Sequence, residues 1–340
     1  MRKIHLAVAA AMAMTVVGAA HARDQISIVG SSTVYPFATI VAEKFGQSSG
    51  FKTPVIESTG TGGGMKLFCK GIGVEHPDIT NASRAMKSSE ADLCKKAGVE
   101  FQEFVVGNDG VAFSNSNKGQ HFKISIAHIA AALAKDIVVD GKVVANNLMT
   151  WDKVDAYVAQ QTNVSKIGLP AIPVKVMVPP PTSGTRDAMG SLFMKAGWKK
   201  LGLAKGDAKN AYKKLREDGA AIEVGENDNL IIEKLATDSE MFGVFGYSFF
   251  DQNRDKVQAS LLDGVELNFD NIASYQYPGA RPLFFYVKKS HVGVIPGLKE
   301  FVTEFVSEKA MSIDGYLFPA GLVPLSDEDY AKTKSGLGNL

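Results

Sequence analysis

The sequence predicts an α/β fold with a largely parallel sheet, divided into two lobes. Short β-rich runs are each followed by a turn and then by a helix-like stretch, and this alternation is typical of parallel strands joined by helices. The chain of 340 residues is 45% hydrophobic, which is enough for a large core. It contains no internal repeat and no low-complexity tract.

Three strand–turn–helix units occupy the first part of the chain. Their strands are expected at residues 25–29, 54–57 and 78–81, and their helices at 34–45, from about 65 and from 88. The first helix is defined by apolar side chains that share one face at helical spacing: Val34, Phe37, Ala38, Val41, Ala42 and Phe45. Pro36 falls in its first turn, where the missing N–H does no harm.

Two later β-rich runs, residues 110–114 and 283–287, are expected to cross between the lobes. The other elements expected in this part are strands at 175–178 and 242–247 and an amphipathic helix at 298–306. We therefore expect lobe I to comprise residues 23–112 and 285–340, and lobe II residues 113–284.

Residues 1–22 have the pattern of an export signal. Arg2 and Lys3 supply the charged start, residues 4–18 are apolar, and Ala20-His21-Ala22 is a small-x-small cleavage pattern, with cleavage after Ala22. The apolar run is too short for a comfortable membrane span. Since no cysteine lies near the cleavage point, a lipid anchor is excluded. We expect a periplasmic protein, and free secretion is the alternative.

The sequence has two cysteines, Cys69 and Cys94. In an oxidising compartment we expect them to form one disulfide; two buried free thiols are the alternative. They do not form a C-x-x-C or metal-ligand pattern, so redox catalysis is not expected.

Loss of Arg2 and Lys3 leaves 35 basic residues against 36 acidic ones, a net charge of −1. This near-neutral balance argues against nucleic acid or an anionic membrane surface as the partner.

Three stretches pair glycines with hydroxyl residues where a strand is expected to pass into a helix: residues 30–34, 58–64 and 182–186. A helix start offers free backbone N–H groups and the positive end of the helix dipole, which together hold an oxyanion. Ligands of α/β sheets bind beyond the carboxyl ends of the strands, so we expect these turns to share one site. The candidate hydroxyl contacts are Ser32, Thr33, Thr61, Ser183 and Thr185. Taken singly, Ser32, Thr33 and Thr61 are better explained as plain N-caps than as ligand contacts.

Two features favour a ligand site over simple capping. Gly60, Gly62, Gly63 and Gly64 remove the Cβ atoms that would keep a ligand from the backbone. Arg186 lies at an expected helix start, where the dipole disfavours a cation, so a nearby anion would explain its position. The alternative for Arg186 is a surface pair with Asp187. Arg84, after Ser83, is a similar candidate with a similar alternative.

Asp109, in the stretch 106–110, bears on the identity of the anion. A carboxylate among oxyanion donors repels a fully ionised anion but accepts a hydrogen bond from a protonated one. Phosphate keeps a proton near neutral pH and sulfate does not, so Asp109 would favour phosphate. The alternative is an ordinary Asn-Asp-Gly turn.

The chain resembles the phosphate-binding proteins of phosphate ABC importers, a branch of the type II periplasmic binding proteins. The matching stretches come in the family's order: residues 30–36, 60–66, 81–87, 183–186 and 243–247. The resemblance implies two lobes joined by a hinge of two crossing strands, each lobe a mostly parallel sheet flanked by helices. It implies inorganic phosphate in the cleft between the lobes, a membrane permease and an ATPase as partners, and no cofactor. The phosphate contacts it implies are Thr33, Val34, Thr61, Ser83, Arg84, Ser183, Gly184 and Thr185.

Some relatives carry an aspartate directly after the serine that matches Ser83, and an arginine four residues before the serine that matches Ser183. Those positions hold Arg84 and Pro179 in this chain. The departure implies exchanged roles, with Asp109 as the proton acceptor and Arg84 and Arg186 as the cations.

Three alternatives remain open on the sequence. The first is a binding protein for another oxyanion, such as sulfate, molybdate or tungstate. The second is an exported phosphatase, but we expect no enzyme: Met65 precedes Lys66 where a Walker loop needs glycine, no G-x-S-x-G elbow is present, and the histidines lack metal-ligand spacing. The third is an adhesive or sensory role on the same fold. We expect the chain to act as a monomer.

Overall fold

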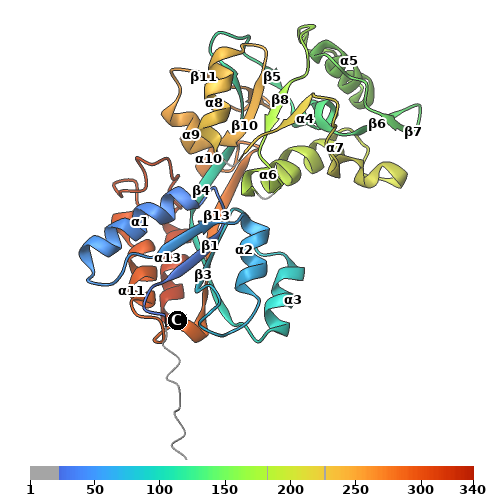
Figure 1. Ribbon diagram of the computed structural model, residues 1–340. Helices are drawn as coiled ribbons and strands as arrows, with labels where there is room; N and C mark the ends of the chain where they lie inside the picture. The colour runs from blue at the N-terminus through green and yellow to red at the C-terminus, as the bar shows by residue number, and fades with distance from the viewer. Residues whose placement is uncertain (1–22, 182, 226) are drawn as a thin grey trace, which may run out of the picture.

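The computed structural model describes residues 23–181, 183–225 and 227–340. The predicted export signal, residues 1–22, and Thr182 of the third turn lie outside the described residues. Figure 1 shows two lobes connected by a pair of long strands. Among the helices of the described ranges, none has the length and apolar content needed to cross a membrane.

The strands and helices of lobe I and the connecting pair are β1 (Ser27–Gly30), α1 (Tyr35–Ser48), β2 (Val55–Ser58), α2 (Thr61–Phe68), β3 (Ile79–Ala82), α3 (Ser88–Lys96), β4 (Phe101–Ser116), β13 (Ala280–Lys288), α11 (Leu298–Phe305), α12 (Glu308–Met311) and α13 (Asp327–Ser335).

Those of lobe II are β5 (Lys123–Ile124), α4 (Ile126–Leu133), β6 (Asp136–Val139), β7 (Lys142–Ala145), α5 (Trp151–Thr162), β8 (Val176–Val178), α6 (Gly184–Ala188), α7 (Ala196–Lys200), β9 (Ala221–Glu223), α8 (Asp228–Thr237), β10 (Phe242–Gly246), α9 (Tyr247–Gln252), β11 (Val257–Ala259), β12 (Leu261–Leu262) and α10 (Phe269–Ala273). A π-helical stretch, Met189–Lys195, joins α6 to α7.

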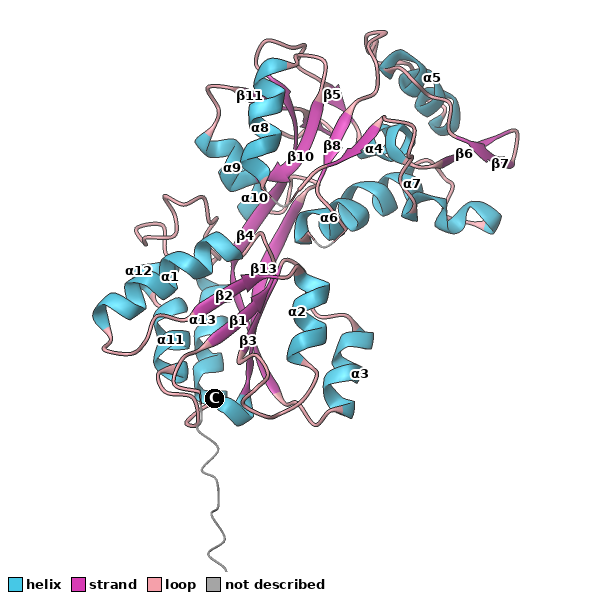
Figure 2. Ribbon diagram, viewed as in Figure 1, coloured by secondary structure: helices cyan, strands magenta, loops and turns pink. Residues whose placement is uncertain are grey.

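Nine strands of the described residues form one mixed sheet in the order β2-β1-β3-β13-β4-β10-β8-β9, with β11 paired to β4. The strands β2, β1 and β3 are parallel, as are β10, β8 and β9. Between them β13 runs antiparallel to both β3 and β4, and β10 runs antiparallel to β4. The predicted two-lobed α/β fold is confirmed, and its sheet is mixed because the connecting strands are antiparallel (Figure 2).

The connecting strands β4 and β13 are longer than the two runs predicted to cross. They pair from Ala280 opposite Gly110 to Lys288 opposite Phe101, and this register places Arg281 opposite Asp109. Residues directly opposite on antiparallel strands have their side chains on the same face and close together. The position of this pair proves central to the site.

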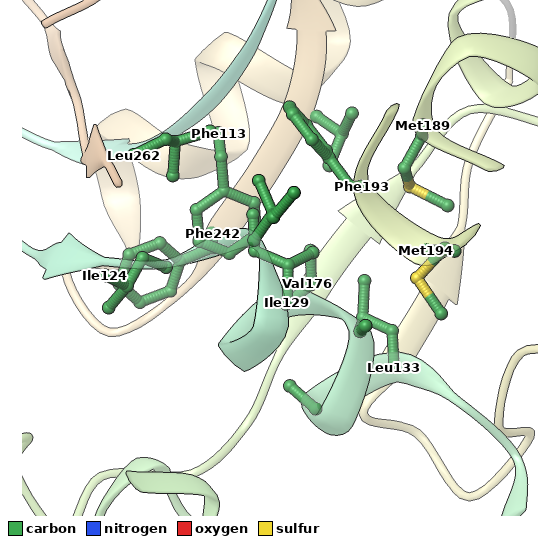
Figure 3. Packing of buried hydrophobic residues seen from close by; sticks show 14 of the residues in the cluster. Phe113, Ile124, Ile129, Leu133, Val176, Met189, Phe193, Met194, Phe242 and Leu262 are labelled. Carbon is green, nitrogen blue, oxygen red and sulfur yellow. The ribbon is translucent and has the colours of Figure 1, made fainter. Parts of the chain in front are cut away.

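Each lobe has its own hydrophobic core. In lobe II, Phe113 of β4 and Phe242 of β10 stack with ring centroids 5.2 Å apart, and Figure 3 shows Ile124 and Leu262 packed beside them. In lobe I, Phe285 of β13 stacks on Phe305 of α11 at 4.9 Å. Both cores include side chains of β4 and β13, so one core gives way to the other along these two strands. The exact lobe limits predicted after residues 112 and 284 stay a prediction.

Helix α2 begins at Thr61, whereas the sequence analysis placed its start near Met65 and treated the glycines as a loop. That expectation was wrong by one turn. Gly60 adopts φ +71°, which turns the chain from β2 into the helix, and Gly62 to Gly64 form the first helical turn. A Cβ on Gly64 would lie 2.5 Å from the Cα of Gly30, so its absence lets α2 pack directly on β1.

The predicted disulfide between Cys69 and Cys94 is confirmed. It joins the end of α2 to α3, and both cysteines are fully buried in a cluster with Met65, Phe68 and Tyr286.

Replacing both cysteines by alanine is expected to lower the free energy of unfolding by about 3 kcal/mol, because the bridge spans 25 residues and restricts the unfolded chain. Urea denaturation of the oxidised parent and the double variant measures this. A double variant with the parent's midpoint and slope would show that the bridge adds no stability.

Candidate functional site

The hydroxyl residues of the predicted turns meet between the two lobes. Ser32 Oγ lies 3.4 Å from Ser183 Oγ, and Thr33 Oγ1 lies 3.2 Å from Thr185 Oγ1. Within lobe I, Thr61 Oγ1 lies 3.2 Å from Ser83 Oγ. The helices α2 and α6, which carry two of these turns, lie on the same side of the connecting strands (Figure 2).

Local hydrogen bonds explain how the first turn presents its side chains. Ser31 Oγ accepts from the backbone N–H groups of Thr33 and Val34, at 3.2 and 3.4 Å, in the turn before α1. The N-cap of α1 is Val34, so neither Ser32 nor Thr33 is the cap, and their hydroxyls contact lobe II. The plain N-cap interpretation does not describe them.

The other two turns differ from each other. Thr61 is the first residue of α2, and its hydroxyl accepts the backbone N–H of Ser83 at 3.2 Å, which ties α2 to the end of β3. Ser183 is the N-cap of α6 and accepts the N–H of Thr185 at 3.1 Å. Ser183 thus caps α6 in addition to its contact with Ser32.

Gly184 packs closely against lobe I. A Cβ at this position would overlap Ser83 Oγ and lie 3.0 Å from Ser31 Oγ, and both serines belong to lobe I. A side chain at residue 184 thus requires the Ser83 hydroxyl to shift while the lobes stay in contact.

A buried arginine that the sequence analysis missed joins both lobes. Nε and Nη2 of Arg281 donate to Oδ2 of Asp109 at 3.0 and 2.8 Å, and the two side chains are only 5% and 4% exposed. Nη1 donates to the carbonyl of Gly184 at 2.8 Å, and Nη2 lies within 3.4 Å of the hydroxyls of Thr33 and Thr185. A charge this deeply buried requires a partner, and Asp109 supplies it.

No motif in the sequence marked Arg281, because it follows a turn outside the three glycine stretches. The feature that identifies Arg281 is the register of β4 on β13, which puts it beside Asp109.

Asp109 is engaged through both carboxylate oxygens. Besides Arg281, it accepts the backbone N–H of Tyr247, at the start of α9, through Oδ1 at 3.3 Å. Burial, helped by the charge of Asp109, raises the pKa of Tyr277, so this phenol stays neutral and donates to the carbonyl of Val111 at 2.9 Å. The role of Asp109 as a proton acceptor for the ligand stays a prediction.

Arg84 and Arg186, the two predicted cations, both have protein partners. Arg84 donates to both oxygens of Glu90 at 2.8 Å and, through Nε, to Asp187 at 3.1 Å. Arg186 donates to the carbonyl of Pro179 at 2.7 Å and lies 3.6 Å from Glu223. Burial lowers the pKa of Arg186. The structure thus pairs Asp187 with Arg84, and not with Arg186 as the alternative had it.

This arrangement suits a small oxyanion. Hydroxyl donors, the starts of α1 and α6 and one buried guanidinium converge from both lobes. Within residues 23–181, 183–225 and 227–340, no three His, Cys, Asp or Glu side chains gather as metal ligands would.

Known proteins resemble this chain over most of its length. The curated relatives include protein SphX of Synechococcus elongatus, 27% identical over 91% of this chain and 80% of its own, and phosphate-binding protein PstS of Staphylococcus saprophyticus, 26% identical over 92% and 83%. A solved structure titled a possible phosphate binding protein from Planctomyces limnophilus has a TM-score of 0.60 at 25% identity, covering 93% and 98% of the two chains. An ABC-type phosphate transport receptor from Vibrio cholerae has a TM-score of 0.59 at 20% identity, covering 88% and 99%, and shows the same fold.

The resemblance that the sequence motifs indicated is confirmed by these relatives. The model of the family described as "PBP superfamily domain" matches residues 15–309, which is most of the chain. The protein belongs to the PBP superfamily.

Proposed function

We propose that the protein captures inorganic phosphate in the cleft between its lobes and delivers it to an ABC permease in the membrane. The observation that carries the proposal is the meeting of Thr33 and Thr185, from opposite lobes, beside the buried Arg281 guanidinium. The name of the Staphylococcus saprophyticus relative, phosphate-binding protein, supports the choice of anion.

Phosphate binding replaces contacts that the protein makes with itself. The hydroxyls of Ser32 and Thr33 now face those of Ser183 and Thr185 at 3.4 and 3.2 Å. When the anion enters, each hydroxyl donates to a phosphate oxygen, and the N–H groups at the starts of α1 and α6 add further donors. The lobes close over the anion by bending at β4 and β13, so binding shifts the population toward the closed form.

Arg281 supplies the positive charge in this proposal. Its Nη2 lies within 3.4 Å of hydroxyls from both lobes. Carboxylates and a carbonyl hold Arg84 and Arg186, as they also hold Arg281, and the choice of Arg281 rests on its place among the hydroxyls. Thr61 and Ser83 complete the donor set on lobe I.

Calorimetry on ligand-stripped protein tests the proposed function directly. We expect one phosphate to bind per chain, with sulfate and molybdate binding much more weakly. Tight binding of sulfate or molybdate together with weak binding of phosphate would favour the alternative of another oxyanion.

Replacing Asp109 by asparagine is expected to reduce the preference for phosphate over sulfate by about tenfold or more. The carboxylate disfavours a fully ionised anion, and its loss leaves the charge of Arg281 available to sulfate. Competition calorimetry with both anions gives the ratio. If the ratio of the affinities for phosphate and sulfate is unchanged, Asp109 does not discriminate between the anions and serves only to position Arg281.

The proposed site of action rests on the predicted export signal. We propose that the signal is cleaved after Ala22, that the mature chain acts in the periplasm as a monomer, and that its closed form is recognised by a permease driven by an ATPase. The protein performs no reaction in this proposal.

A further inference from the structure

An ion pair connects the lobes outside the hydroxyl site. Nε of Arg84, at the end of β3, donates to Oδ2 of Asp187 in α6 at 3.1 Å. The two side chains are 19% and 34% exposed, so the pair is partly shielded from water. Asp187 belongs to the same short helix as Gly184 and Thr185, and it therefore moves with the anion-binding turn of lobe II.

Apart from its bond to Asp187, the guanidinium of Arg84 is held in place by lobe I. Its Nη1 and Nη2 donate to the two oxygens of Glu90 at 2.8 Å, and Nη1 also reaches the carbonyl of Ala85 at 3.1 Å. Glu90 is itself fixed by the backbone N–H of Lys87 at 2.8 Å. Because Glu90 holds Nη1 and Nη2 of Arg84, Nε stays directed at the other lobe. The Arg84 side chain therefore loses little entropy when the cleft closes.

We propose that Arg84, Glu90 and Asp187 form an interlobe latch that sets how long the anion stays bound, without contacting the anion. The inference rests on the proposed function, since it requires an anion in the cleft. Glu90 holds Arg84 in position, and Asp187 reaches Arg84 only in the closed form. Opening of the cleft must break the bond between Arg84 and Asp187 before the anion leaves.

The latch lies at the edge of an open groove, which makes it sensitive to salt. Both of its interlobe partners line a cavity of about 590 Å³. The other charged residues of that cavity are Lys87, Arg186, Lys195 and Lys213. Ions that enter the groove screen the pair, whereas the buried Arg281 and Asp109 pair is screened much less.

Replacing Asp187 by asparagine is expected to raise the dissociation rate of phosphate about fivefold and to leave the association rate nearly unchanged, because an ion pair of this exposure contributes modestly and only to the closed form. Stopped-flow release of phosphate, followed with a separate phosphate sensor, measures the dissociation rate. Dividing this rate by the dissociation constant from calorimetry gives the association rate. In the parent, raising the salt to about 1 M, where the Debye length is about 3 Å, should speed release; in the variant it should do so less.

The same variant separates the latch from direct anion binding by Arg84. If Arg84 contacted the phosphate, loss of the competing carboxylate would slow release, which is the opposite sign and would overturn the latch. In an Arg84→Gln background, Asp187→Asn should have no further effect; an effect of full size there would also overturn it.

Glu217→Gln is the matched control. It removes the same charge from lobe II at an exposed side chain that pairs with Lys135 of its own lobe, and it should leave the release rate unchanged. Failure of the parent to bind phosphate would contradict the proposed function itself. A parent that binds phosphate and an Asp187→Asn variant that releases it at the parent's rate would contradict the latch alone.

Discussion

Replacing Arg281 by methionine is expected to lower the affinity for phosphate by at least a hundredfold. Arg281 is the buried cation that contacts Thr33, Thr185 and the carbonyl of Gly184, so the variant loses the positive charge and the alignment of both lobes. The change also leaves Asp109 buried without its partner, which should lower the free energy of unfolding by about 3–5 kcal/mol. Calorimetry and urea denaturation give the two quantities separately.

A second variant keeps this prediction falsifiable if the first is too unstable to purify. Arg281→Met combined with Asp109→Asn removes the unpaired charge, and we expect much of the lost stability to return while phosphate binding stays absent. Arg281→Lys keeps the charge but not the two-point contact with Asp109, so it should bind phosphate with intermediate affinity. A stable double variant with the parent's affinity would show that Arg281 is structural only.

Replacing Gly184 by valine is expected to prevent closure of the cleft. Even a Cβ at this position overlaps Ser83 Oγ across the interlobe contact, and valine adds two more carbon atoms. The cost should exceed about 3 kcal/mol, which corresponds to a loss of affinity of more than two orders of magnitude. Small-angle X-ray scattering should show that phosphate compacts the parent but not the variant, and calorimetry measures the affinity.

Gly190→Val is the control for helix propensity. Gly190 lies in the π-helical continuation of α6, and a Cβ there meets no other atom within 4 Å. Both substitutions place a β-branched residue in the same helical run, so their intrinsic costs should be similar. If Gly184→Val compacts on phosphate and binds it as tightly as Gly190→Val does, the proposed closure at Gly184 is wrong.

Local signals in the sequence predicted the fold correctly because they depend on neighbouring residues. The face of α1 could be identified from Val34 to Phe45, since apolar spacing directly reflects which side of a helix is buried. The glycine and hydroxyl pattern identified the turns at residues 30–34 and 183–186 for the same reason. The start of α2 was misplaced because glycine has low helix propensity, and the close packing of Gly64 on Gly30 outweighs that preference.

Only the tertiary structure decided which charges meet. Arg281 and Asp109 are 172 residues apart in the chain, and Arg84 and Asp187 are 103 apart, so no local pattern links them. Their pairing depends on the register of β4 against β13 and on the closeness of α6 to the end of β3. The sequence alone therefore determined the two-lobed α/β fold, the disulfide and the presence of the turns that we propose to hold the anion. The placement of the charges came from long-range packing, because a buried charge takes the partner that the folded chain brings to it.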